Sequence, residues 1–132
     1  MENKKRIKDY GEVFTQKREV DSILNLVKNE TLNLESRFLE PACGDGNFLV
    51  EILSRKISIL NSRFKKDKID FERNSIIALS SLYGIDILSD NIDKLNVRLL
   101  DIFVKNYQDH FGEINPDFLK SIKYLLKKNL KF

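Results

Sequence analysis

One stretch of the chain decides its fold: Phe38-Leu39-Glu40-Pro41-Ala42-Cys43-Gly44-Asp45-Gly46-Asn47-Phe48-Leu49. Its apolar start predicts a short buried strand over 37–40, which the proline ends. The two glycines allow the backbone to turn sharply, because they carry no Cβ atom. Apolar residues then recur at helical spacing, namely Leu49, Ile52, Leu53, Ile57 and Leu60. The stretch therefore predicts a strand, a tight turn and a helix that begins near Asn47.

A second strand and helix follow further along the chain. Residues 82–87 predict a strand with an acid, Asp86, near its C-terminal end, and a long helix is expected from about Asp90 to Gly112. Strand, helix, strand and helix in this order indicate a parallel pair, the start of a doubly wound α/β sheet. Ligands of such sheets bind beyond the carboxyl ends of the strands, where both the glycine turn and Asp86 fall. We therefore expect the two to be neighbours in space.

The rest of the chain is predicted to be mostly helical. Residues 20–27 follow the period of an amphipathic helix, and Thr15 stands where its N-cap belongs. The charged residues 61–75 are expected to form a surface insert. The final helix, over 115–128, opens with an Asn-Pro pair typical of a capped helix start. A new strand is expected to start at Asn129.

Composition bounds the class of protein. The chain has 132 residues, of which 42% are hydrophobic and 33% charged, as expected of one folded domain. No apolar run approaches the roughly 20 residues of a membrane span, so we expect no membrane partner and a cytoplasmic location. A single cysteine, Cys43, and a single histidine, His110, predict neither a disulfide nor a metal site. The lysines after residue 119 favour a solvated flank over a phosphate-binding surface.

The glycine turn and Asp86 suit a particular kind of ligand. A carboxylate at the end of the second strand can accept hydrogen bonds from both hydroxyls of a ribose. The third glycine of a dinucleotide-binding turn is absent, since Leu49 stands there, and Asp45 would repel a phosphate. A nearly neutral adenosyl ligand is therefore favoured over a dinucleotide. Two structural alternatives stay open: the glycines can serve the turn alone, and Asp86 can cap the segment that follows it.

Three segments resemble motifs X, I and II, in this order, of the gamma-type S-adenosylmethionine-dependent DNA methyltransferases that methylate adenine N6 in restriction-modification systems. The matching residues are Gly11-Glu12-Val13-Phe14-Thr15, Leu39-Glu40-Pro41-Ala42-Cys43-Gly44-Asp45-Gly46-Asn47-Phe48-Leu49 and Tyr83-Gly84-Ile85-Asp86-Ile87. The resemblance implies an incomplete Rossmann-like class I methyltransferase fold, a parallel sheet with flanking helices and later strands missing. Within one partial domain over 1–132, motif X falls in 8–28, motif I in 36–60 and motif II in 82–107.

The resemblance also implies the cofactor, S-adenosyl-L-methionine, and the residues that hold it. Phe14 and Thr15 would pack over its methionine end, Glu40 would lie near its amino group, and Asp86 would bind the ribose hydroxyls with Ile87 against the adenine. Gln16 departs from the proline that is usual in motif X. The full expected set is Phe14, Thr15, Glu40, Pro41, Ala42, Gly44, Asp45, Gly46, Asn47, Phe48, Asp86 and Ile87.

Catalytic residues are not identified. These enzymes hold the target amino group with an Asn-Pro-Pro-Tyr motif, whereas Asn115-Pro116-Asp117-Phe118 lacks a preceding buried strand and reads as a helix cap. We therefore expect cofactor binding without catalysis by this chain alone. DNA would be contacted through missing regions or a partner, such as a complementing methyltransferase fragment or a specificity or restriction subunit. A methyltransferase acting on RNA, protein or a small molecule, or a truncated non-catalytic binding domain, are the alternatives.

Overall fold

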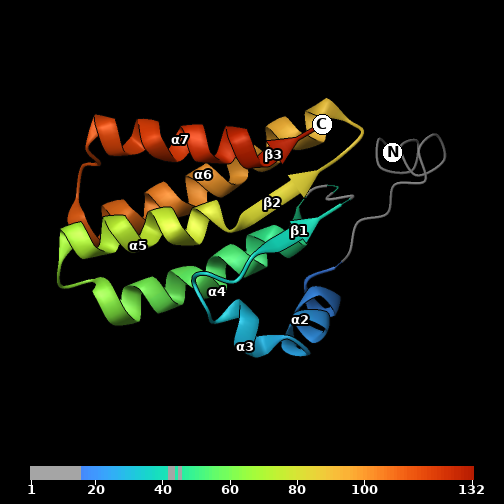
Figure 1. Ribbon diagram of the computed structural model, residues 1–132, viewed down its shortest axis with the longest axis horizontal. Coiled ribbons are helices and arrows are strands. Elements are labelled where there is room, and N and C mark those ends of the chain that lie inside the picture. The colour runs from blue at the N-terminus through green and yellow to red at the C-terminus, as the bar shows by residue number, and fades with distance from the viewer. Residues whose placement is uncertain (1–15, 42–43, 45) are drawn as a thin grey trace.

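A small parallel sheet lies at one end of a mostly helical molecule (Figure 1). The computed structural model describes residues 16–41, 44 and 46–132. The strands β1 (Phe38–Glu40), β2 (Leu82–Ile85) and β3 (Leu130–Lys131) are parallel and lie in the order β1-β2-β3. Phe38 pairs with Leu82, and Gly84 pairs with Leu130. The predicted α/β class is confirmed, and the strand expected at Asn129 is present as β3.

Helices fill each connection between the strands. The helices are α2 (Lys17–Asn25), α3 (Lys28–Thr31), α4 (Asn47–Phe64), α5 (Lys68–Ser80), α6 (Ser89–Phe111) and α7 (Pro116–Asn129). The pair α4 and α5 joins β1 to β2, and the pair α6 and α7 joins β2 to β3. In Figure 1, α4 and α6 run behind the strands, whereas α5 and α7 extend to the left of the sheet. None of the helices in the described ranges has the length and apolar character needed to cross a bilayer.

The prediction of a charged surface insert over 61–75 is wrong. Helix α4 continues to Phe64, and α5 begins at Lys68, where the Asp67 carboxylate accepts hydrogen bonds from the N–H groups of Ile69 and Asp70. Along its length α5 buries Phe71, Ser75, Ala78 and Leu79. The charged residues of this segment lie on the outer side of an amphipathic helix. The charged composition therefore did not indicate the buried residues on the other side of that helix. Only the short turn between α4 and α5 is a charged surface segment of the kind predicted.

Both ends of the α6–α7 connection agree with the sequence. Gly112, with φ of 77°, ends α6. The Asn115 side chain accepts hydrogen bonds from the N–H groups of Asp117 and Phe118 at 2.8 and 3.2 Å, and Pro116 is the first residue of α7. The helix-cap interpretation of this Asn-Pro pair is therefore confirmed. Thr15, the predicted N-cap of α2, lies outside the described residues.

The hydrophobic core lies between the helices and one face of the sheet. The five apolar residues predicted for α4, from Leu49 to Leu60, are all buried. Leu82 and Leu130 bring the strands into the same core, and each such side chain stabilises the fold by roughly 1.5–3 kcal/mol. Tyr83 is only half-buried, because it lies on the opposite face of β2.

A buried lysine joins the entrances of β1 and β2. Lys56, on the core side of α4, donates hydrogen bonds from Nζ to Leu34 O at 3.0 Å, Ser36 O at 2.6 Å and Ser81 Oγ at 2.6 Å. The same Nζ lies 5.4 Å from the centre of the Phe38 ring. Burial lowers the pKa of this ammonium to about 8. Since Leu34 and Ser36 precede β1 and Ser81 precedes β2, Lys56 holds the two strands together at their N-terminal ends.

Candidate functional site

The glycine turn and the acid after β2 meet at the carboxyl ends of the strands. Glu40, the last residue of β1, pairs with Gly84 of β2, and Asp86 follows β2 immediately after Ile85. The backbone N–H of Gly44 donates a hydrogen bond of 2.8 Å to Asp86 Oδ2, across 42 residues of chain. The predicted proximity of the turn and the acid is therefore confirmed.

Asp86 also organises the start of α6. This residue is 7% exposed, and its Oδ1 accepts hydrogen bonds from Leu88 N–H at 2.8 Å and Asn91 Nδ2 at 3.3 Å. Together with Gly44, these donors take three of about four acceptor positions on a carboxylate. Asp86 thus caps the segment that follows it, as the structural alternative proposed. Its Oδ2 has the capacity for one more hydrogen bond, such as one from a ligand hydroxyl.

The two glycines are required by the backbone and by packing. Gly44 and Gly46 have φ of 55° and 81°, in the left-handed region that favours glycine. Gly46 is also the N-cap of α4, and a Cβ there would lie 2.1 Å from Leu95 Cδ1 of α6. The close contact of α4 with α6 is therefore sufficient to explain Gly46. The first N–H groups of α4 begin at this turn.

The other expected ligand residues lie in different surroundings. Glu40 is half-buried, and burial raises the pKa of its carboxyl. Asn47 is half-buried, and its Oδ1 accepts a 2.9 Å hydrogen bond from Arg98 Nη1 of α6. Phe48 packs against the core, and Ile87 is 75% exposed. Pro41 is exposed at the end of β1.

Part of the predicted set cannot be placed. Phe14, Thr15, Ala42 and Asp45 lie outside the described residues. The structure therefore brings together Glu40, Gly44, Gly46, Asn47 and Asp86 at one edge of the sheet, and it leaves the motif X contacts as predictions.

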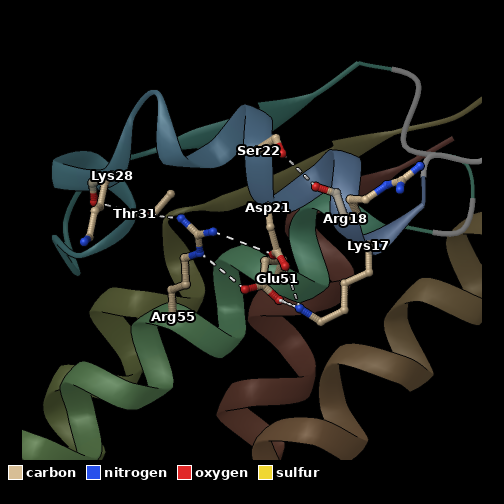
Figure 2. Close-up of polar contacts among 8 residues, drawn as sticks. All are labelled: Lys17, Arg18, Asp21, Ser22, Lys28, Thr31, Glu51 and Arg55. Atoms are coloured by element: carbon tan, nitrogen blue, oxygen red, sulfur yellow. Dashed lines mark hydrogen bonds and ion pairs between the residues drawn. The ribbon is translucent and has the colours of Figure 1, made fainter.

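A network of four charges anchors α2 on α4 (Figure 2). Lys17 of α2 lies 2.9 Å from Asp21 and 3.6 Å from Glu51, and Arg55 of α4 lies 3.3 Å from Glu51 and 3.7 Å from Asp21. Each cation thus contacts both acids, one from its own helix and one from the other. Arg55 Nη1 also donates to Thr31 Oγ1 at 3.3 Å, which attaches α3. The network places α2, which lies within the range 8–28 of motif X, beside the first turns of α4.

This arrangement leaves a small cavity near the start of α4. Its volume is about 210 Å³, and its lining includes Lys17, Asn47 and Arg98, which come from α2, α4 and α6. The cavity is bordered by the same helix start that follows the glycine turn.

Three features of the structure were missed in the sequence. Lys56 has a sequence signal in its spacing, since Ile52, Lys56 and Leu60 lie four residues apart on one buried face of α4. Asn91 lies in the first turns of α6, where an amide can reach the acid that precedes the helix. The α2–α4 network has a signal too, because Lys17–Asp21 and Glu51–Arg55 are both spaced by four residues.

The described residues contain no group of three or more His, Cys, Asp or Glu side chains that could hold a metal ion. No protein-family model, curated protein or solved structure matches the chain. The interpretation of the site therefore depends on its own geometry and chemistry. That geometry offers acceptors for hydroxyl groups and for a cation, together with backbone N–H donors at a helix start.

Proposed function

We propose that this chain is the S-adenosylmethionine-binding N-terminal portion of a site-specific DNA (adenine-N6) methyltransferase of a restriction-modification system, with a partial Rossmann-like class I fold. One observation carries the proposal: Gly44 N–H donates to the Asp86 carboxylate at 2.8 Å, where β1 and β2 end side by side. A bare backbone turn beside a buried acid at this edge is the arrangement that an adenosyl ligand needs. The motif resemblance supplies the identity of that ligand.

The described residues have chemistry that suits each part of the cofactor. The remaining acceptor capacity of Asp86 Oδ2 suits a ribose hydroxyl, and the half-buried Glu40 carboxylate suits the ammonium of the methionine part. Ile87, exposed beyond β2, offers an apolar contact for the adenine ring. When bound, S-adenosylmethionine supplies a methyl group activated by attachment to a sulfonium sulfur. The role of these residues is to bind and orient it.

We propose further that the chain does not transfer the methyl group to DNA alone. Base methylation requires acceptors that hold the target amino group outside the duplex. The side-chain Oδ1 of Asn115, the nearest sequence equivalent, accepts hydrogen bonds from the N–H groups of Asp117 and Phe118 as the cap of α7. DNA contact and catalysis would come from further parts of the enzyme, from a complementing methyltransferase fragment, or from a specificity or restriction subunit.

A thermodynamic cycle on Asp86 tests the cofactor proposal. The wild-type chain and Asp86→Asn are titrated calorimetrically with S-adenosylmethionine and with an analogue that lacks both ribose hydroxyls. We expect the wild type to lose roughly 1.5–3 kcal/mol of binding free energy when the hydroxyls are removed, because a charge-assisted hydrogen bond is lost. Asp86→Asn should lose much less. The same loss in both proteins would remove Asp86 from the ribose contact, and no saturable binding would refute the proposal.

A second experiment addresses catalysis. The chain is incubated with S-adenosylmethionine labelled in its methyl group and with duplex DNA, RNA or bulk protein as acceptors. We expect no incorporation into any acceptor by this chain alone. Incorporation into DNA would contradict the claim that catalysis needs another part, and incorporation into RNA or protein instead would change the substrate class.

A further inference from the structure

The two faces of the sheet have different surroundings. In a parallel sheet, paired residues point to the same face, and residues alternate between faces along each strand. The pair Phe38–Leu82 lies on the face that packs against the helices. The pairs Leu39–Tyr83 and Ile85–Lys131 lie on the other face. We call the surface formed by Leu39, Tyr83 and Ile85 the open face.

The open face is apolar and in contact with solvent. Leu39 is 60% exposed, Ile85 is 44% exposed, and Tyr83 is half-buried. Figure 1 shows this side, with β1 and β2 in front of α4 and α6. Purely parallel sheets are almost always covered on both faces, because apolar side chains project from each. The strand residues that join the helical core, Phe38, Leu82 and Leu130, all point to the covered face. Within the described residues, the apolar side chains of the open face therefore lack such a cover.

We propose that the open face is the docking surface for an amphipathic α-helix of a partner chain, with acidic side chains flanking its apolar stripe. The dimensions suit one helix: strands lie about 4.8 Å apart, so a few strands present a strip comparable in width to a helix about 10 Å across. The apolar stripe of that helix contacts Leu39 and Ile85, and Tyr83 lies beneath it. The opposite face of the same sheet is already covered by helices, so a helix is the natural cover for the open face as well.

The charged residues around the open face indicate which side chains should flank the apolar stripe of the partner helix. Lys131, paired with Ile85, is exposed on the open face, and Arg37 is exposed two residues before Leu39. Lys127 and Lys128 are exposed at the end of α7, immediately before β3. The acid of the strands, Glu40, pairs with Gly84 and so points to the covered face. An apolar strip with basic borders is complementary to an acidic amphipathic helix rather than to a basic one.

The open face is a property of the sheet geometry and does not depend on the cofactor, whereas its assignment to a complementing fragment rests on the proposed function. It deepens the proposed function by naming the surface and the chemistry of the partner that a complementing fragment would present. If the chain binds no S-adenosylmethionine, the open face is still uncovered. If the chain binds the cofactor, the helix partner can still be refuted, so the two proposals fail separately.

Synthetic helical peptides with a leucine stripe test the surface directly. One peptide carries glutamate flanks, a second carries lysine flanks, and a third has the glutamate sequence scrambled. Each fluorescent peptide is titrated by anisotropy with the full chain, with Ile85→Gln on the open face, and with Ile69→Gln on α5. Ile69 is a matched control, since it is 62% exposed but lies away from the sheet. Lys131→Glu tests the charge.

We expect the glutamate-flanked peptide to bind at least about tenfold more tightly than the other two, since one tenfold step corresponds to a single well-buried contact. Ile85→Gln should lose about tenfold in affinity, Ile69→Gln should match the wild type, and Lys131→Glu should reduce the preference for glutamate flanks. Equal effects of Ile85→Gln and Ile69→Gln, or equal binding of the two charged peptides, would overturn the proposal. Sedimentation that shows a dimer broken by Ile85→Gln, without peptide binding, would assign the face to a second copy instead.

Discussion

Gly44 and Asp86 are joined by a 2.8 Å hydrogen bond from a backbone N–H to a carboxylate, although 42 residues separate them. The bond connects the turn after β1 to the residue after β2, so the geometry of the candidate site depends on a single buried acid. The same carboxylate accepts hydrogen bonds from Leu88 and Asn91 at the start of α6. Asp86 is therefore a structural junction, and we propose the same carboxylate as the acceptor for a ribose hydroxyl.

Replacing Asp86 by Ala should lower the free energy of unfolding and also weaken ligand binding. The N–H groups of Gly44 and Leu88 and the Asn91 amide would lose their acceptor, and a buried donor left unpaired costs about 1–3 kcal/mol. Urea denaturation of the wild type, Asp86→Ala and the exposed control Asp101→Ala measures this loss. Unchanged unfolding free energy for Asp86→Ala would show that the hydrogen bonds at this junction contribute nothing to stability.

Replacing Lys56 by Met should also destabilise the chain, by about 1–3 kcal/mol. Methionine keeps much of the buried aliphatic stem but leaves Leu34 O, Ser36 O and Ser81 Oγ without their shared donor. Chemical denaturation, with Lys105→Met at an exposed position of α6 as the control, gives the difference. A Lys56→Met chain as stable as the wild type would mean that apolar burial compensates for the lost hydrogen bonds.

The stability of the wild type relative to Lys56→Met should rise with pH. The pKa of Lys56 is lowered to about 8 in the folded chain, against 10.5 for an unperturbed lysine. Below pH 8 both the folded and the unfolded chain are protonated, and the full cost of burying the charge is present. Between pH 8 and 10.5 the unfolded chain binds more protons, so the unfolding free energy increases with pH.

The slope of this increase approaches about 1.4 kcal/mol per pH unit at most for one proton. Unfolding free energies of both proteins, measured at matched pH values across that window, give their difference as a function of pH. Other titrating groups cancel in the difference. A flat difference would show that Lys56 keeps its ordinary pKa in the folded chain.

Cofactor binding should weaken at acid pH because of Glu40. Burial raises the pKa of this carboxyl above its ordinary 4.5 in the free chain. A bound ammonium would favour the carboxylate and lower that pKa, so binding below the free-chain pKa must release a proton. Affinity for S-adenosylmethionine is then lost as pH falls through the free-chain pKa, and it is constant above it.

Calorimetry from acid to neutral pH checks this dependence. Glu40→Gln should bind more weakly and lack the dependence, whereas the exposed control Glu35→Gln should retain it. The same pH profile in Glu40→Gln and the wild type would place the proton release on another group.

Replacing Arg55 by Met should loosen α2 without unfolding the rest of the chain. Arg55 is the contact between α4 and Asp21 of α2, and it also contacts Glu51 and Thr31. We expect faster hydrogen exchange of the α2 amides, with the amides of α6 unchanged. Arg63→Met, at an exposed position near the end of α4, is the control. Equal α2 protection in all three proteins would show that the network of charges does not hold this helix.

Local patterns predicted most of the elements. The strand before Pro41, the glycine turn, the apolar stripe of α4 and the Asn-Pro start of α7 each follow from residues adjacent in sequence. The sequence prediction failed at residues 61–75, because charged residues lie before Phe71 and between it and Ser75, and they obscure the helical spacing of these buried residues. Lys56 was missed for a related reason, since a lysine is normally solvated unless acceptors from distant segments surround it.

The sequence by itself determined that a glycine turn and an acid end two strands of an α/β chain, because glycine backbone freedom and apolar spacing act over neighbouring residues. Tertiary structure alone decided that Asp86 is already engaged by Gly44 and Asn91, that Lys56 joins two strand entrances, and that one face of the sheet is open. These properties depend on which segments come together in space. They arise from long-range hydrogen bonding and from the choice of the face on which the helices pack.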